Sequence, residues 1–411
     1  MKMDYQEATR ILIECAEPVG IEEISIEKCA GRVLGADIIA GENVPSFDRS
    51  PYDGYAFRAA DTHEATEQTP VTLKVVENIR AGQMPERAIN PGEAIRLMTG
   101  APVPAGADAV CKYEDTEFTD NTVTLKKSYK TGDNVVTAGE DISKGSELMR
   151  EGYRIDAGMM GTLASLGIMS VPVYRKPVIG IISTGDEVVE PGEELPPGKI
   201  RNSNRYTIAA ALESIGLETR YLGHADDTVE GISELIREGE KSCDLLISTG
   251  GVSVGDYDLV PDAMEACGYE VFTRGVAMKP GMACAYGKKT VTRQGTERAQ
   301  LFLGLSGNPA SSLTNLQCVC YPAIRKIAGL AEYEHKKIRF KSGSDITKIG
   351  KMGTRFIRGR VDFRDGDIVL DAPSSQGNVV ISSAIRCDAY AIFSAGHAPV
   401  KHGDMIEGFM V

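Results

Sequence analysis

Between about residues 176 and 330, apolar and polar residues form two alternating patterns, one typical of buried strands and one typical of helices. Short apolar runs have the length of buried strands. They lie at 178–182, 218–222, 244–248 and 301–305. After each run, apolar residues recur at helical spacing, over 204–215, 228–239, 257–267 and 309–327. This alternation of strand and helix predicts a parallel sheet that is covered by helices on both faces.

For two predicted helices the sequence indicates more detail: the ends of one helix and the apolar face of another. Ser203 or Asn204 can cap the start of the helix at 204–215 through its side-chain oxygen, and Gly216 follows its end. Residues 1–15 have the pattern of an amphipathic helix with one apolar face. That face holds Ala8, Ile11, Leu12 and Cys15.

Outside the predicted α/β domain at 176–330, the composition and the pattern of apolar residues predict three further domains. Residues 46–139 are rich in Pro, Gly and Val and contain short alternating runs, which is typical of a small β domain. Helix-like sequence returns near 157–166, so we expect 1–45 and 140–175 to pack together as a discontinuous linker domain. Residues 331–411 have no long helical pattern and indicate a small barrel or sandwich.

Composition narrows the classes of partner. The chain has 411 residues and a formal net charge of −13, which disfavours general binding to nucleic acid or to an anionic membrane. No apolar run approaches the roughly 20 residues that span a bilayer, and we expect a cytoplasmic protein. The nine cysteines include no CxxC pair, which indicates reduced thiols and argues against a zinc site or a disulfide framework.

Glycine-containing turns follow three of the expected strands. The turns are Ser183–Glu187, Ser248–Gly251 and Ser306–Pro309. Because parallel strands present their carboxyl ends at one edge, we expect these turns to lie together, where backbone N–H groups can bind a phosphate. The spacing matches neither a Walker loop nor a dinucleotide fingerprint.

Carboxylates crowd the same edge, although they repel phosphate. They are Asp186, Glu187, Asp226, Asp227, Asp256 and Asp258. Two such charges about 4 Å apart repel by about 4 kcal/mol at an effective dielectric of about 20. A Mg²⁺ ion would relieve that repulsion, because it binds a few carboxylates and bridges to phosphate oxygens. Asp256 or Asp258 could instead serve only as an N-cap of the helix, if that helix begins at 259 and runs to 267.

Longer motifs along the chain resemble the molybdopterin molybdenumtransferase family, which includes MoeA and the E domain of gephyrin. The α/β region carries STGDE at 183–187, GGVSVGDYD at 250–258, MKPG at 278–281 and GNPAS at 307–311. Earlier segments carry PSFDRSPYDGYAF at 45–57, LMTGAPVPAGADAV at 97–110 and GEDI at 139–142. The motifs span most of the chain and keep the order that the family has.

The resemblance implies a fold and a reaction. It implies a multidomain chain with a discontinuous linker domain, a small β domain, a three-layer α/β domain like that of MogA, and a carboxyl-terminal β barrel. It also implies a homodimer that inserts molybdate into adenylylated molybdopterin in a Mg²⁺-dependent reaction and releases AMP. Other proteins of cofactor biosynthesis are implied as contacts.

The resemblance further assigns roles to individual residues. Glu187, Asp227 and Asp258 would bind Mg²⁺, with Asp226 and Asp256 as alternatives to their neighbours. Asp53, Thr99 and Asp141 would act from the β and linker domains across the dimer, and Lys279 would neutralise phosphate. The substrate pocket would be lined by Ser183, Thr184, Gly185, Asp186, Gly250, Gly251, Ser253, Gly307, Asn308 and Pro309.

Five positions depart from the usual family pattern. Ser306 replaces a proline and Met282 replaces a cation, both at expected phosphate contacts, while Pro51-Tyr52 and Asn378 stand in place of Ala-Met and Ser. Three alternatives to an enzyme that inserts molybdate remain. A molybdopterin adenylyltransferase would need little more than the α/β domain, a tungstate-using paralogue would have the same motifs, and a non-catalytic scaffold would not need to keep the acids.

Overall fold

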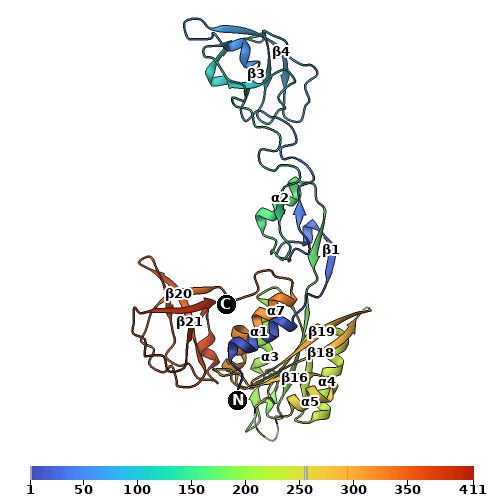
Figure 1. Ribbon diagram of the computed structural model, residues 1–411, viewed down its shortest axis with the longest axis vertical. Coiled ribbons are helices and arrows are strands. Elements are labelled where there is room, and N and C mark those ends of the chain that lie inside the picture. Colours follow the sequence, from blue (N-terminus) through green and yellow to red (C-terminus); the bar gives the residue numbers. More distant parts are fainter. Residues whose placement is uncertain (1, 254, 256–257, 294) are drawn as a thin grey trace. The chain divides into compact units, whose positions relative to one another are not determined.

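The computed structural model describes residues 2–253, 255, 258–293 and 295–411 and contains two compact units (Figure 1). The first unit comprises Met1–Ala36, Glu151–Asp156 and Ser170–Val411, and the second comprises Asp37–Arg150 and Ala157–Met169. All nine cysteines are free thiols. Among the described residues, no helix has both the length and the apolar character needed to cross a membrane.

The first unit is built on a six-stranded sheet. Its strand order is β14 (Glu218–Ala225), β11 (Val178–Thr184), β15 (Leu245–Thr249), β19 (Thr296–Leu305), β18 (Cys284–Arg293) and β16 (Glu270–Arg274). The first four strands are parallel, as expected, but β18 runs antiparallel to both of its neighbours. The parallel arrangement of the four predicted strands is therefore confirmed, and the sheet is mixed because β18 and β16, which the sequence pattern did not predict, extend it with antiparallel pairs. β18 and β19 pair from Cys284↔Leu305 to Arg293↔Thr296 as a hairpin, which requires antiparallel strands.

Helices cover both faces of this sheet (Figure 1). One face packs against α1 (Tyr5–Cys15), α3 (Ser203–Glu213), α6 (Pro309–Asn315), the π-helical turn η4 (Leu316–Cys320) and α7 (Tyr321–Ile327). The other face packs against α4 (Val229–Ser242) and α5 (Val260–Ala266). Side chains alternate accordingly: Leu245 and Ile247 contact the first helical layer, and Leu246 contacts the second. The structure confirms a three-layer α/β domain.

Two helix predictions need correction. The N-cap of α3 is Asn202, whose side-chain oxygen accepts a hydrogen bond from the Arg205 N–H at 3.2 Å, and not Ser203 or Asn204. The long helix expected at 309–327 is divided by η4, because Pro322 has no N–H to donate to the preceding turn.

The carboxyl-terminal region closes into a barrel, which decides between the barrel and the sandwich. Its strands are β20 (Lys337–Ser342), β21 (Thr354–Arg364), β22 (Asp367–Asp371), β23 (Ala389–Phe393) and β24 (Met405–Met410). They pair around a full circuit, from β21 through β22, β20, β24 and β23 back to β21. The short strand β17 (Met278–Lys279) leaves the α/β layer and pairs with β21.

The second unit contains the small β domain. Its sheet has the order β6 (Ala109–Lys112), β3 (Gly54–Phe57), β5 (Glu93–Leu97), β4 (Val71–Ile79), β8 (Thr122–Leu125) and β7 (Thr116–Phe118). Beside it, β2 (Ile38–Ile39) pairs with β9 (Glu147–Met149), near α2 (Ala157–Ser165). In the first unit, β1 (Ile21–Ser25) pairs with β10 (Ser170–Tyr174). In both units, strands from the first 40 residues therefore pair with strands from 147–174. The remaining short helices are η1 (Ile26–Lys28), η2 (Ala59–Thr62), η3 (Tyr113–Asp115) and η5 (Ile381–Ala384).

Candidate functional site

A small cavity of about 50 Å³ lies at the carboxyl ends of β11, β15 and β19; we call it the strand-end cavity. Six of its lining residues were expected from the sequence, namely Ser183, Thr184, Glu187, Gly250, Gly307 and Pro309. The others are Val188, Ile200, Arg201, Asn202, Ser203, Asn204 and Thr249. Three turns that are distant in the sequence thus meet at one edge of the sheet, as the parallel order of these strands requires.

Glycine is needed where the first two turns touch. Gly250 has a φ of +97°, and a Cβ there would lie 2.6 Å from the Thr184 Oγ1. The adjacent Gly251 also has a positive φ, of +63°. The Thr184 hydroxyl donates to the Thr249 carbonyl at 3.3 Å, so the turns after β11 and β15 are in direct contact. A larger residue at position 250 would push them apart.

Asn204 joins the turns after β15 and β19. Its Nδ2 donates to the Thr249 Oγ1 at 2.6 Å and to the Gly307 carbonyl at 2.9 Å, and its side chain is almost fully buried. Sequence reasoning considered Asn204 only as a helix cap. The available signal was the pair of asparagines at 202 and 204, directly before an amphipathic helix.

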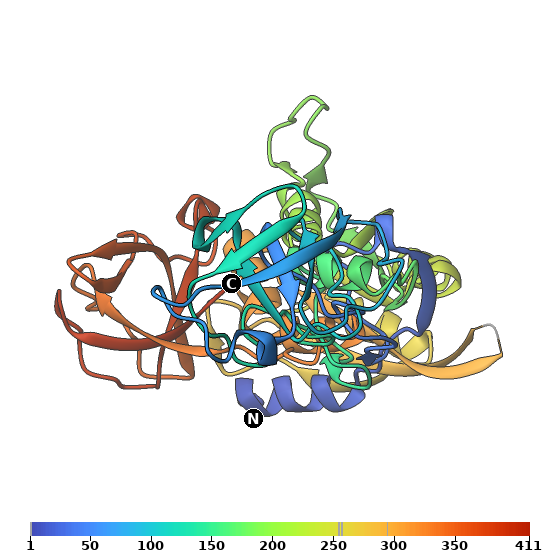
Figure 2. The same ribbon diagram turned by 90° about the horizontal axis from the view of Figure 1, so that it is seen from above.

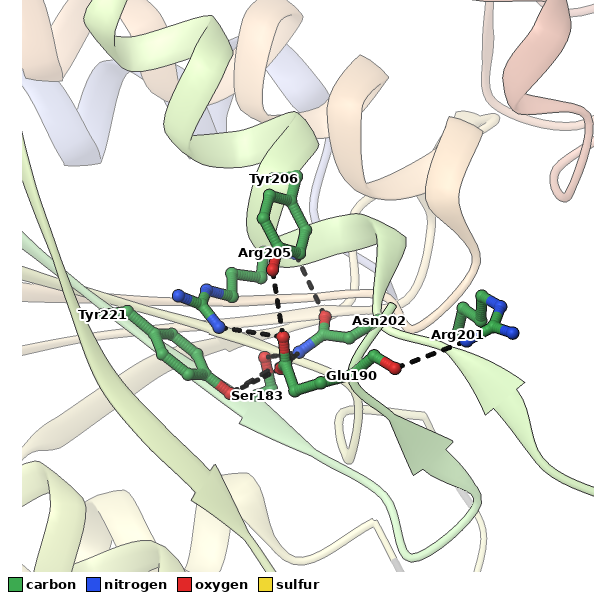
Figure 3. Close-up of polar contacts among 7 residues, drawn as sticks. All are labelled: Ser183, Glu190, Arg201, Asn202, Arg205, Tyr206 and Tyr221. Carbon is green, nitrogen blue, oxygen red and sulfur yellow. Dashed lines mark hydrogen bonds and ion pairs between the residues drawn. The ribbon is translucent and has the colours of Figure 1, made fainter. Parts of the chain in front are cut away.

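Glu190 organises the wall behind the cavity (Figure 3). Its carboxylate accepts hydrogen bonds from Asn202 at 2.9 Å, Arg205 at 2.8 Å and the Tyr206 hydroxyl at 3.1 Å. Burial opposes ionisation, but these donors outweigh it and lower the pKa of Glu190. Asn202 also donates to the Ser183 Oγ at 3.0 Å, so the cluster reaches a residue that lines the cavity.

The loop between β12 (Val188–Val189) and β13 (Ile200–Arg201) projects from the α/β layer (Figure 2). Arg201 stabilises the start of this loop, because one of its guanidinium nitrogens donates to the carbonyls of Pro191 and Glu193 at 2.8 and 2.9 Å. The ammonium group of Lys199 donates to the Asp186 carbonyl. Both cations therefore lie at the edge that carries the expected acids.

The expected acids come together only in part. The Asp186 N–H donates to the Asp227 carboxylate at 3.2 Å, and the Asp227 N–H donates to the Asp186 carboxylate at 3.4 Å. Asp226 accepts from Thr228 at 3.1 Å, which leaves Asp227 as the acid paired across the two turns. Within the part of the chain that the structure describes, no three His, Cys, Asp or Glu side chains are grouped to hold a metal ion.

The turn after β15 is described only in part, since Asp256 lies outside the described residues. Asp258 accepts from the Gly255 N–H at 2.7 Å, and the N-cap of α5 is Leu259, so Asp258 is not that cap. Ser253 is exposed. Gly185 opens the turn that carries Asp186, with a φ of +115°.

The turn after β19 leads directly into α6. The Ser306 hydroxyl accepts from the Asn308 N–H at 3.2 Å, which is how the residue in place of the family proline is used. Pro309 is the first residue of α6. The Ser311 N–H donates to the Asn378 carbonyl at 3.1 Å, which ties α6 to the carboxyl-terminal barrel.

A second, larger cavity of about 790 Å³ lies where β17 joins the barrel; we call it the basic cavity. Lys279 lines it together with Lys348, Arg355, Gln376 and Gly377. Arg355 is 7% exposed, and its Nε is buried without a hydrogen-bond partner. Burial and the nearby positive charge of Arg358 lower the pKa of Arg355. The sequence singled out Lys279 but gave no sign of Arg355, because the barrel segment carries no chemical motif of its own.

The second unit holds the remaining expected residues. The Asp53 carboxylate accepts from the Thr99 N–H at 2.6 Å and from the Thr99 hydroxyl at 2.8 Å, and these hydrogen bonds lower the pKa of Asp53. Asp141 is exposed, and its N–H donates to the Val44 carbonyl at 3.1 Å. It lines a cavity of about 600 Å³ with residues of α2. Asp53 and Thr99 thus form a pair.

Comparison with known proteins identifies the class of this fold and site. Residues 3–167 match the MoeA N-terminal region (domain I and II), and residues 180–326 match a probable molybdopterin binding domain. The molybdopterin molybdenumtransferase of Bacillus subtilis (strain 168) is 36% identical over 410 residues, which cover 98% of this chain and 93% of that protein. The protein of the same name from Staphylococcus epidermidis is 33% identical and covers 93% of this chain and 90% of its own length.

A solved structure gives the same result for the fold. The crystal structure of a molybdopterin biosynthesis MoeA protein from Pyrococcus horikoshii matches with a TM-score of 0.85 and 31% identity, covering 100% of this chain and 99% of that chain. The chain belongs to the molybdopterin molybdenumtransferase family. This confirms the resemblance drawn from the motifs and the expectation of an enzyme of molybdenum cofactor biosynthesis.

Proposed function

We propose that the protein inserts molybdate into adenylylated molybdopterin in a Mg²⁺-dependent reaction and releases AMP. The observation that carries the proposal is the pairing of two cavities around one helix. Pro309, at the start of α6, lines the strand-end cavity, and Ser311, in the first turn of α6, is hydrogen bonded to the loop that walls the basic cavity. A substrate that joins a phosphate to a metal-binding pterin needs two such places close together.

The strand-end cavity suits the phosphate and nucleotide part of the substrate. Its glycine turns can present backbone N–H groups to a phosphoanhydride. Asn204 and Asn202 hold the three turns in fixed positions. Cleavage of an anhydride depends mainly on positioning and on neutralising the charge that develops on the phosphate oxygens.

The basic cavity suits molybdate. A tetrahedral dianion needs cationic or N–H donors, and a net charge of −13 means that these must be local. Arg355 supplies a buried guanidinium with a free Nε, and Lys279 supplies an exposed ammonium group. The cavity is far larger than an oxyanion and leaves room for part of a pterin. Tungstate has the same charge and shape, so it is the alternative oxyanion.

The acids fit Mg²⁺ that is held jointly with a substrate phosphate. The Asp186 and Asp227 carboxylates each accept a hydrogen bond from the other residue's N–H, and Glu187 faces the strand-end cavity. Mg²⁺ is commonly bound by one or two carboxylates together with phosphate oxygens and waters, and it then neutralises the charge of the anhydride. This pattern does not require a group of three protein acids, so we keep Glu187, Asp227 and Asp258 as the proposed metal-binding set.

Several further features of the family are part of this proposal. The protein is a cytoplasmic homodimer in which Asp53, Thr99 and Asp141 serve the reaction of the partner subunit. The four domains have the boundaries 1–45 with 140–175, 46–139, 176–330 and 331–411. The Asp53 carboxylate is well suited to a charged role, because its hydrogen bonds to Thr99 favour the ionised form.

The test is AMP release from adenylylated molybdopterin by the purified protein, with Mg²⁺ and molybdate each present or omitted. We expect release that requires both and yields active cofactor. Release only with tungstate would identify the paralogue. Consumption of ATP with unadenylylated molybdopterin would identify an adenylyltransferase, and binding without any AMP release would indicate a scaffold.

A further inference from the structure

Glu190 lies at the centre of the polar cluster behind the strand-end cavity (Figure 3). Its carboxylate accepts hydrogen bonds from four side chains, at distances between 2.8 and 3.4 Å. The donors are Asn202, Arg205, Tyr206 and Tyr221. The sequence motif at 183–187 ends before Glu190, so the family resemblance assigns this residue no role. A carboxylate with four donors nevertheless does more than solvate a surface loop.

The neighbours of Asn202 fix the orientation of its side-chain amide. Oδ1 accepts from the Arg205 N–H at 3.2 Å, and a backbone N–H can only donate. Nδ2 therefore faces Glu190 at 2.9 Å, and an ionised carboxylate can only accept. Nδ2 also donates to the Ser183 Oγ at 3.0 Å. The Glu190 carboxylate and the start of α3 thus require the same orientation of the amide, and that orientation directs a donor to Ser183.

This chain of hydrogen bonds ends at the strand-end cavity. Asn202 and Ser183 both line it, and their exposed fractions are 3% and 1%. The backbone makes a parallel connection, because the Asn202 N–H donates to the Val189 carbonyl and the Ile200 N–H donates to the Glu187 carbonyl, both at 2.8 Å. A change in the position of Asn202 would therefore be felt on two sides of the cavity.

Arg205 allows Glu190 to stay ionised beside a site for an anion. The Arg205 guanidinium donates to the carboxylate at 2.8 Å, and its central carbon lies 3.7 Å from the centroid of the Tyr221 ring. Although burial opposes ionisation, the donors lower the pKa of Glu190, so the carboxylate is charged at neutral pH. An unpaired carboxylate would repel a phosphate, and the Arg205 charge offsets that repulsion.

We propose that Glu190 is a positioning residue of the strand-end cavity, whose carboxylate fixes the Asn202 amide and thereby holds Ser183 where a nucleotide phosphate binds. The inference rests on the proposed function for the identity of the ligand, but not for the chain of hydrogen bonds. An amide at position 190 cannot replace the carboxylate, because its nitrogen would face donors from either Asn202 or Arg205. Asn202 could relieve the first conflict only by turning over, which would break its hydrogen bond to Ser183.

The experiment compares four variants of the full chain with the wild type. Glu190→Gln replaces one of the two acceptor oxygens by a donor. Asn202→Ser removes the amide but keeps an oxygen that can cap α3, and a third variant combines both changes. Glu194→Gln is the matched control, because Glu194 is exposed in the same loop and loses the same charge. AMP and molybdate binding are measured separately by calorimetry, and hydrogen exchange is measured for residues 200–206.

We expect Glu190→Gln to weaken AMP binding about tenfold, as the loss of one or two hydrogen bonds would, and to speed exchange at 200–206. Its molybdate affinity, and both affinities of Glu194→Gln, should stay within about twofold of the wild type. Because Glu190 acts through Asn202, adding Glu190→Gln to Asn202→Ser should change AMP affinity by less than about twofold.

Unchanged AMP affinity in a folded Glu190→Gln protein would overturn the inference. Tighter binding would also overturn it, since the charge of Glu190 would then act directly on the ligand. So would an equal loss of AMP affinity from Glu190→Gln with and without Asn202→Ser. If the wild type binds no AMP, the proposed nucleotide site fails, and exchange at 200–206 alone decides whether Glu190 holds Asn202.

Discussion

His335 gives the protein a defined sensitivity to acid. Its ring stacks on Phe409 with centroids 3.9 Å apart, and its Nδ1 lies 3.4 Å from the Arg325 guanidinium. Burial, with a further contribution from the Arg325 charge, lowers the pKa of His335 from 6.5 to about 4. The folded protein therefore keeps this imidazole neutral where an unfolded chain would protonate it.

The sign and size of the effect follow from that shift. Between the folded and unfolded pKa values the unfolded chain binds the extra proton, so stability falls as the pH falls. A full shift from 6.5 to about 4 corresponds to about 3 kcal/mol, of which about 2 kcal/mol is lost by about pH 5. His335→Phe keeps an aromatic ring on Phe409 but cannot titrate.

The assay is urea unfolding followed by far-ultraviolet circular dichroism at about pH 7.5 and about pH 5. Carboxylates titrate alike in both proteins, so the difference between the wild type and His335→Phe isolates the histidine. We expect the wild type to lose about 2 kcal/mol more than the variant on acidification. Equal losses, or a His335 pKa near 6.5 measured by NMR, would refute the reasoning.

Three further predictions concern the strand-end cavity. Glu187→Ala should reduce AMP release at least a hundredfold and leave the melting temperature nearly unchanged, because the side chain is exposed at the cavity; a folded variant with near-normal turnover would exclude the role. Asn204→Leu should lower the free energy of unfolding by about 1–3 kcal/mol and weaken AMP binding, since Thr249 and Gly307 lose their donor. Glu190→Gln should leave Arg205 without its carboxylate partner and speed trypsin cleavage at Lys199 and Arg201; cleavage at the wild-type rate would contradict a role of Glu190 in holding the loop between β12 and β13.

The sequence predicted those parts of the site that lie within single segments. The turns at 183–187, 248–251 and 306–309 were identified because each follows an apolar run, and parallel strands must bring their ends together. The role of Asn204 was not predicted, because this residue joins segments that are distant along the chain. An asparagine that opens a helix has the same local signature whether it caps that helix or holds two remote turns.

The fold was predictable for a similar reason. Alternating strand and helix patterns imply a layered α/β fold. The β18–β19 hairpin has no helix between its two strands, so the alternation did not predict β18. The turn at η4 depends on a single residue, Pro322, inside an otherwise helical pattern. The acids proposed to bind a metal could be narrowed to one edge of the sheet but not to a ligand set, because a Mg²⁺ ion commonly takes part of its coordination from a substrate and from water.

The packing of α1 has a consequence for synthesis on the ribosome. α1 is made first, yet its apolar residues Ala8 and Leu12 share one core with α7, and the Lys326 ammonium donates to the Ile13 carbonyl at 2.8 Å. At about 5–20 residues per second, the roughly 300 intervening residues take about 15–60 s to emerge. The second unit can fold during that interval, but the apolar face of α1 stays exposed until α7 has been synthesised. α1 is therefore a segment of the nascent chain that needs protection from aggregation until α7 has been made.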